Sequence, residues 1–125
     1  MNRDQILNMP AGRDLDALIA THVMGWKQDD SEQGAYFDFW ITAQDDPDAK
    51  VQLNQFQFST DINLAFPLVE KLGLVIGYDE DEGYPGENWL ACLEWDPESA
   101  YAARGESAPL AICRTVLLII TDATE

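Results

Sequence analysis

Positively charged residues are scarce in this sequence. It has 7 Lys and Arg against 23 Asp and Glu, which gives a formal net charge of −16 over 125 residues. Broad binding to DNA or RNA is therefore not expected, because it needs a positive surface that releases counterions from phosphates. A few local basic residues would still be enough to hold a small anion.

Cysteine, histidine and long apolar runs are also sparse. The 2 cysteines, Cys92 and Cys113, lie in apolar segments without CxxC spacing, which is typical of reduced, buried thiols. The single histidine, His22, lies on a predicted helix, where a structural role is favoured over acid–base catalysis. The apolar run 116–120 is far shorter than the roughly 18 residues that cross a bilayer, and residues 1–5 do not lead into a signal peptide. We expect a soluble intracellular protein with no disulfide, no metal site and no cofactor.

Two windows hold most of the negative charge. Residues 29–48 and 79–98 contain 7 and 8 acidic residues and no Lys or Arg, whereas the other 85 residues carry 8 acids and 7 bases. Solvated loops that keep the protein soluble explain this pattern, and so does an acidic surface that meets a basic partner. The acidic pairs Asp45/Asp46 and Asp79/Asp81 lack the spacing of a calcium loop and are interpreted as solvated charge.

Motifs for catalysis are missing as well. There is no nucleophile motif, no glycine-rich phosphate loop and no HExxH zinc pattern. We therefore expect that the protein is not an enzyme.

Hydrophobic periodicity and turn residues predict one α+β domain over residues 1–125, with the element order α-β-β-α-β-β-α. Hairpin-linked strands imply a mainly antiparallel sheet, on which the helices pack in an αβα sandwich-like arrangement. Pro67 predicts a kink or a restart of its helix near residue 66, and Ser107 is the expected N-cap of the last helix. The predicted helices are 12–24, 62–72 and 110–120, with one possible helical turn in 98–105, and the predicted strands are 36–41, a strand beginning at Val51, 74–78 and 89–95.

Three blocks of sequence resemble the phage ABA sandwich domain family, which occurs in bacteriophage and prophage genomes. They appear in the family's order and cover about half of the chain, while Pro67 and the acidic loops depart from the pattern. The blocks are residues 1–9 running into 11–18 and 23–26, residues 58–62 with 69–72, and residues 108–114.

This resemblance implies a helix–sheet–helix sandwich and a function. Similar small phage proteins include anti-Thoeris sponges, which bind cyclic ADP-ribose signals of bacterial defence and related cyclic oligonucleotides. The resemblance implies a non-enzymatic homo-oligomer, in the cytoplasm of the infected bacterium, that sequesters such a messenger without cleaving it.

Three arginines are candidates for binding the phosphates of such a ligand. Arg114 interrupts an apolar helix, where a guanidinium needs an acid or a phosphate as partner, so an internal ion pair and a ligand or interface role both stay open. Arg104 lies beside Gly105 in the preceding loop, where a plain surface position is favoured over an anion-binding role. Arg13 lies near the start of the first helix.

The remaining candidates would contact the base and ribose or the phosphates. Ser59 and Thr60 precede a helix whose free N–H groups could bind phosphate, although simple helix capping explains them too. Trp26 could stack on a base or pack over a helix end. Tyr84 and Asn88 lie in a hairpin loop that could reach a ligand, and turn formation alone also explains Asn88.

Two other functions remain open from the sequence. The base-free windows suit an acidic mimic of nucleic acid or another inhibitor of a host protein. A phage structural or accessory oligomer without a small ligand is the third possibility.

Overall fold

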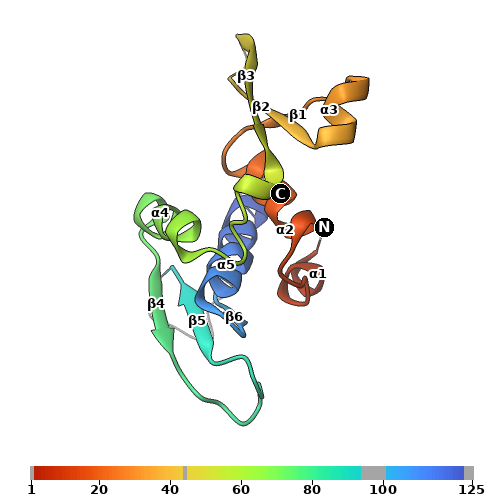
Figure 1. Ribbon diagram of the computed structural model, residues 1–125. Coiled ribbons are helices and arrows are strands. Elements are labelled where there is room, and N and C mark those ends of the chain that lie inside the picture. The colour runs from red at the N-terminus through yellow and green to blue at the C-terminus, as the bar shows by residue number, and fades with distance from the viewer. Residues whose placement is uncertain (1, 44, 94–100, 123–125) are drawn as a thin grey trace.

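The computed structural model describes residues 2–43, 45–93 and 101–122, and it confirms the α+β class and the predicted element order. Additional elements, α1, β1, α3, a short 3₁₀ helix (η1) and β6, extend that order (Figure 1). In chain order the elements are α1 (Arg3–Leu7), α2 (Arg13–His22), β1 (Lys27–Gln28), α3 (Glu32–Phe37), β2 (Phe39–Ala43), β3 (Asp46–Gln52), η1 (Leu53–Gln55), α4 (Ile62–Leu72), β4 (Val75–Tyr78), β5 (Trp89–Cys92), β6 (Ala103–Gly105) and α5 (Ala108–Asp122).

Helix α5 forms the centre of the molecule. Every residue from Leu110 to Leu118 is at most 5% exposed, because α1, α2, α4 and the sheet β4-β5-β6 all pack against this helix (Figure 1). The Ser107 hydroxyl accepts a hydrogen bond from the Leu110 N–H at 3.3 Å, which confirms the predicted N-cap. The Thr115 hydroxyl donates to the Ala91 carbonyl at 2.7 Å and joins α5 to β5.

The expectation of one sheet was wrong, because the described strands form two separate sheets of three. In the sheet β4-β5-β6, the central strand β5 pairs antiparallel with both β4 and β6, and Trp89 lies opposite Tyr78 and Gly105. Residues 103–105, which the sequence suggested as part of a helical turn, are strand β6, since pairing with β5 overrides the local helix preference of alanine. Residues 101–102 are not helical either, and residues 98–100 of that predicted turn and 94–95 of the predicted strand 89–95 lie outside the described residues.

Gly105 allows β6 to approach α5 closely. A Cβ atom at this position would meet the Ala111 amide nitrogen at 2.8 Å and the Leu110 side chain at 3.1 Å. We expect Gly105→Ala to lower the free energy of unfolding by about 1–3 kcal/mol through overpacking, measured by urea denaturation. Gly83→Ala is the control, because its Cβ would meet only the movable Asp81 carboxylate, at 3.3 Å. Equal stability of both variants would contradict the close approach.

The second sheet, β1-β2-β3, forms with α3 an arm, residues 27–52, that extends away from α5 (Figure 1). The predicted strand 36–41 was wrong at its start, since residues 36–37 end helix α3 and β2 begins at Phe39. Local capping explains this: the Ser31 hydroxyl accepts from the Gly34 N–H at 3.1 Å and starts α3. The next predicted strand, expected to begin at Val51, starts earlier in the chain. Strand β3 begins at Asp46 and ends at Gln52.

Two other local expectations meet the structure differently. Helix α4 is a single helix and does not restart near residue 66. Pro67 removes only the N–H that would bond to Asn63, and both residues are exposed, so water can satisfy that carbonyl. Cys92 and Cys113 are free and fully buried as expected, and burial raises the pKa of the Cys113 thiol.

No helix in the described part of the chain is long and apolar enough to cross a membrane.

Candidate functional site

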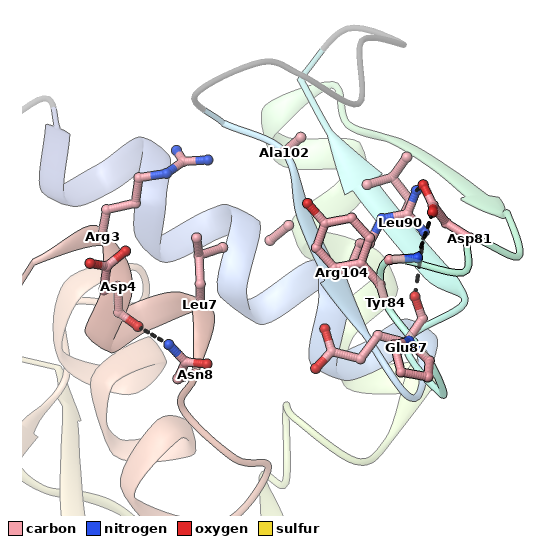
Figure 2. A pocket seen from close by; sticks show the side chains of 13 residues that line it. Arg3, Asp4, Leu7, Asn8, Asp81, Tyr84, Glu87, Leu90, Ala102 and Arg104 are labelled. Atoms are coloured by element: carbon pink, nitrogen blue, oxygen red, sulfur yellow. Dashed lines mark hydrogen bonds and ion pairs between the residues drawn. The ribbon is translucent and has the colours of Figure 1, made fainter.

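The larger of two candidate sites is a cavity of about 680 Å³ between α1 and the β4–β5 hairpin, called the main cavity below. Figure 2 shows the α1 side chains facing those of the hairpin and of the strand residues beside it. The lining residues are Arg3, Asp4, Leu7 and Asn8 from α1, Asp81, Gly83, Tyr84, Pro85 and Glu87 from the hairpin loop, and Leu90, Ala102, Ala103 and Arg104 from β5, β6 and the residue before β6.

Arg104 fixes the hairpin loop that forms one wall of the main cavity. Its guanidinium donates to the Asp79 carbonyl at 2.9 Å and to the Asp79 carboxylate at 2.8 Å, and more weakly to the Glu87 carbonyl at 3.4 Å. The Tyr84 ring covers it, with 4.9 Å from the guanidinium carbon to the ring centroid. The sequence favoured a surface position, but this side chain is only 9% exposed. Arg104 therefore orders the acidic loop in addition to lining the cavity.

Arg114 lies behind the main cavity and is not one of its lining residues. Its guanidinium donates to the Met9 carbonyl at 3.0 and 2.9 Å and to the Arg104 carbonyl at 2.7 Å. The Glu87 carboxylate is 3.8 Å away. Burial lowers the pKa of Arg114, and Glu87 and Glu106 oppose that shift. The side chain thus joins the segment after α1, strand β6 and the hairpin loop, three parts that surround the cavity.

The main cavity combines charges of both signs. Arg3 and Arg104 face it together with Asp4, Asp81 and Glu87, so its formal charge is −1 when all five are ionised. Tyr84 supplies an aromatic face that is 51% exposed, and Asn8 supplies an amide. This lining can bind a ligand that carries anionic groups beside hydroxyl or amino donors.

A smaller cavity of about 280 Å³ lies at the start of α2, called the second cavity below. Its walls come from α2, the end of α3 and the loop before α4, and Arg13 and Thr60 from the predicted set line it. The lining residues are Gly12, Arg13, Asp16, Asp38, Leu53, Asn54, Gln57 and Thr60.

Ser59 lies behind the second cavity and joins the loop before α4 to the start of α2. Its N–H and its hydroxyl donate to Asp16 Oδ1 at 2.8 and 2.7 Å, and its Oγ accepts from the Gly12 N–H at 3.0 Å. Asp61, not Ser59, caps α4, through its carboxylate and the Asn63 N–H at 2.9 Å. Ser59 is fully buried in this network.

Arg13 forms an ion pair with Asp38 at the rim of the second cavity. The guanidinium donates to both Asp38 oxygens, at 3.1 and 2.8 Å, which lowers the pKa of that carboxyl. Asp38 ends α3 in the left-handed conformation with φ of 54°, and its carboxylate also accepts from the Trp40 indole at 3.1 Å. The pair therefore connects the arm to α2.

Trp26 and Asn88 line neither cavity. Trp26 packs edge-on against Phe56, with ring centroids 5.0 Å apart, as one of the two sequence interpretations expects. The Asn88 side-chain amide donates to the Tyr78 hydroxyl at 3.2 Å. The backbone carbonyl of Asn88 accepts from the Asp79 N–H at 2.7 Å at the base of the hairpin.

Sequence reasoning missed the α1 wall and Asp16. A signal for α1 was present: Asn2 and Gln5 form a capping box, with reciprocal bonds of 2.8 and 2.9 Å. Asp16 lies in the first turn of α2, where acidic residues are common, and no local pattern shows that it bonds to Ser59, 43 residues away. The described residues include no group of three His, Cys, Asp or Glu side chains placed to hold a metal ion.

Comparison with known proteins gives a family and a fold. The model of the phage ABA sandwich domain family matches residues 17–117. The chain is also similar to the 2.0 Å crystal structure of a phage protein from Bacillus cereus ATCC 14579, with 24% identity and a TM-score of 0.57 over 88% of this chain and 86% of the other. No curated protein matches the sequence.

Proposed function

Since this chain belongs to the phage ABA sandwich domain family, we propose that it is a phage counter-defence protein that binds a cyclic nucleotide immune signal without cleaving it. The main cavity is the observation that carries this proposal. Its volume of about 680 Å³ falls within the range of roughly 300–1,000 Å³ that is usual for ligands of cofactor size. Cyclic ADP-ribose isomers and cyclic oligonucleotides are the ligand class.

The lining suits a nucleotide that has two phosphates. Arg3 supplies a guanidinium group, Arg104 adds positive charge to the wall while its own guanidinium stays bound to Asp79, and the outer face of the Tyr84 ring offers a surface on which a base can stack. Asp4, Asp81 and Glu87 would repel further negative charge, but they accept hydrogen bonds from ribose hydroxyls and base amino groups. The cavity therefore favours a compact ligand rich in hydroxyls over a longer polyanion.

Retention of the ligand without cleavage is part of this proposal. The described residues around the main cavity offer no Ser, Thr, Cys or His side chain as a nucleophile. Tight binding is then the means by which the signal is removed.

The proposal includes a homo-oligomer. Ile62 and Phe66, one turn apart on α4, are 43% and 49% exposed, and Val75 of the adjacent strand β4 is 38% exposed. A second protomer could cover these apolar side chains.

Ligand depletion tests this function. The purified protein is incubated with cyclic ADP-ribose isomers or cyclic oligonucleotides, and free ligand is measured after filtration and again after heat release. We expect depletion, with the intact ligand recovered on heating, and at least a tenfold weaker affinity for Arg3→Ala and Tyr84→Ala. Lys71→Ala, an exposed change on α4, serves as the control and should bind like the unaltered protein. Absence of depletion with every ligand would overturn the proposal, and cleaved product after heating would contradict retention.

A second candidate function is inhibition of a host nucleic-acid-binding protein through acidic mimicry. The arm favours it, because it extends away from the core and carries five exposed acids, Asp30, Glu32, Asp45, Asp46 and Asp48 (Figure 1). Such a surface should retain basic host proteins from a lysate at low salt and release them as salt rises. Recovery of none would remove this candidate.

A further inference from the structure

The second cavity contains a buried carboxylate with an unused oxygen. Asp16 is 3% exposed, and Oδ1 accepts both hydrogen bonds from Ser59, at 2.8 and 2.7 Å. Both bonds use Oδ1, and Oδ2 is not among the fully buried side-chain atoms that lack a partner in the described part of the chain, so it is accessible from the cavity. Asp16 also lines the cavity, so Oδ2 is the oxygen left for an occupant.

The charge of Asp16 is not needed for the hydrogen bonds that it makes. An asparagine at this position would offer the same carbonyl oxygen to Ser59, without the cost of burying a negative charge. That cost is visible as a raised pKa of Asp16, caused by burial and only partly opposed by the two Ser59 bonds. A cation held at Oδ2 would compensate this charge.

The rest of the second cavity determines what kind of cation fits. Arg13 is occupied by Asp38 at the rim, and Leu53, Asn54 and Gln57 also line the cavity, with the Gln57 amide oxygen already accepting from the Thr60 hydroxyl at 3.3 Å. The described residues assemble no three-ligand metal set here, and a volume of about 280 Å³ suits a small organic molecule. The net charge of −16 also raises the local concentration of cations.

We propose that the second cavity binds a small organic cation, whose guanidinium or primary ammonium group pairs with Asp16 Oδ2 while its apolar stem lies against Leu53. This site is separate from the main cavity and does not depend on the nucleotide function. Occupancy neutralises the buried carboxylate and links α2 to the loop before α4.

Agmatine, which carries both cationic groups, is the probe, and N-butylurea is its neutral counterpart. Agmatine is titrated into the ¹⁵N-labelled protein, and amide shifts are followed at Gly12, Asn54 and Thr60. We expect saturable shifts at these residues, no comparable response to N-butylurea, and at least tenfold weaker binding to Asp16→Asn. The matched control is Asp14→Asn, which removes the same charge from the same helix turn at a side chain that is 94% exposed. This control should change affinity less than twofold.

Three results would overturn the site: no saturable shift at the cavity residues, equal loss of affinity in the two variants, or equal binding of N-butylurea. Equal loss would identify general attraction to an acidic protein. Because nucleotide depletion by the main cavity is measured separately, failure of this site leaves that test unchanged.

Discussion

Replacing Arg114 with Ala is expected to lower the free energy of unfolding by about 3–5 kcal/mol. The guanidinium donates three hydrogen bonds, to the Met9 and Arg104 carbonyls, and its side chain is only 6% exposed. Truncation would leave both carbonyls without these donors and remove the cation 3.8 Å from Glu87. The parts around the main cavity would then lose their common anchor.

Urea denaturation followed by tryptophan fluorescence measures this loss. Arg114→Lys should be intermediate, because one ammonium cannot reproduce the planar fork that reaches both carbonyls. This variant also keeps the test informative if Arg114→Ala does not fold. Arg13→Ala is the control: its pair with Asp38 involves a side chain that is 52% exposed, so we expect a loss of only about 0.2–1 kcal/mol. A loss below about 1 kcal/mol for Arg114→Ala would contradict its role as the anchor.

Elements with strong local signals were predictable from the sequence. Helix α5 has an apolar run behind the Ser107 cap that only Arg114 and Thr115 interrupt, and α4 lies between the capping Asp61 and Gly73, which ends it with φ of 68°. In both cases periodicity and capping agree, so the position of the helix needs no tertiary information.

Elements that depend on distant partners were misplaced. Ala103 favours a helix by composition but pairs with Ala91 in the sheet. Tyr36 and Phe37 favour a strand, yet the Ser31 cap draws them into α3. The division into two sheets cannot be read from hairpin signals, because a hairpin specifies its two strands and not the sheet that they join.

The sequence predicted several individual residues of the candidate site, but not which of them lie together in one cavity. Arg104 and Tyr84 were both singled out, and the structure brings them together in a cation–π contact. Arg13 and Thr60 belong to the second cavity and not to the main one, since the fold of the segment between them determines which residues meet. The buried state of Asp16 is likewise a tertiary property.

Asp16 separates the role of a hydrogen-bond acceptor from the role of a charge. Asp16→Ala would leave the Ser59 N–H and hydroxyl without their acceptor in a buried position, and we expect it to lower the free energy of unfolding by about 2–4 kcal/mol. Asp16→Asn keeps a carbonyl oxygen for both bonds and removes the buried charge, so we expect it to be as stable as the unaltered protein, or more stable, at pH 7.

The pH dependence of the difference between Asp16→Asn and the unaltered protein tests the charge itself. Burial raises the pKa of Asp16 in the folded state above its value in the unfolded chain, so folding favours the protonated carboxyl. The free energy of unfolding of the unaltered protein, relative to that of Asp16→Asn, is therefore highest at pH values below the pKa of Asp16 in the unfolded chain, which is about 4. Its relative stability falls as the pH rises through the folded pKa, and is constant above it. Urea denaturation of both proteins between pH 4 and pH 8 should show the advantage of Asp16→Asn growing with pH, because other titrating groups cancel in the comparison. An advantage that shrinks as the pH rises would mean that a partner stabilises the ionised carboxylate in the fold.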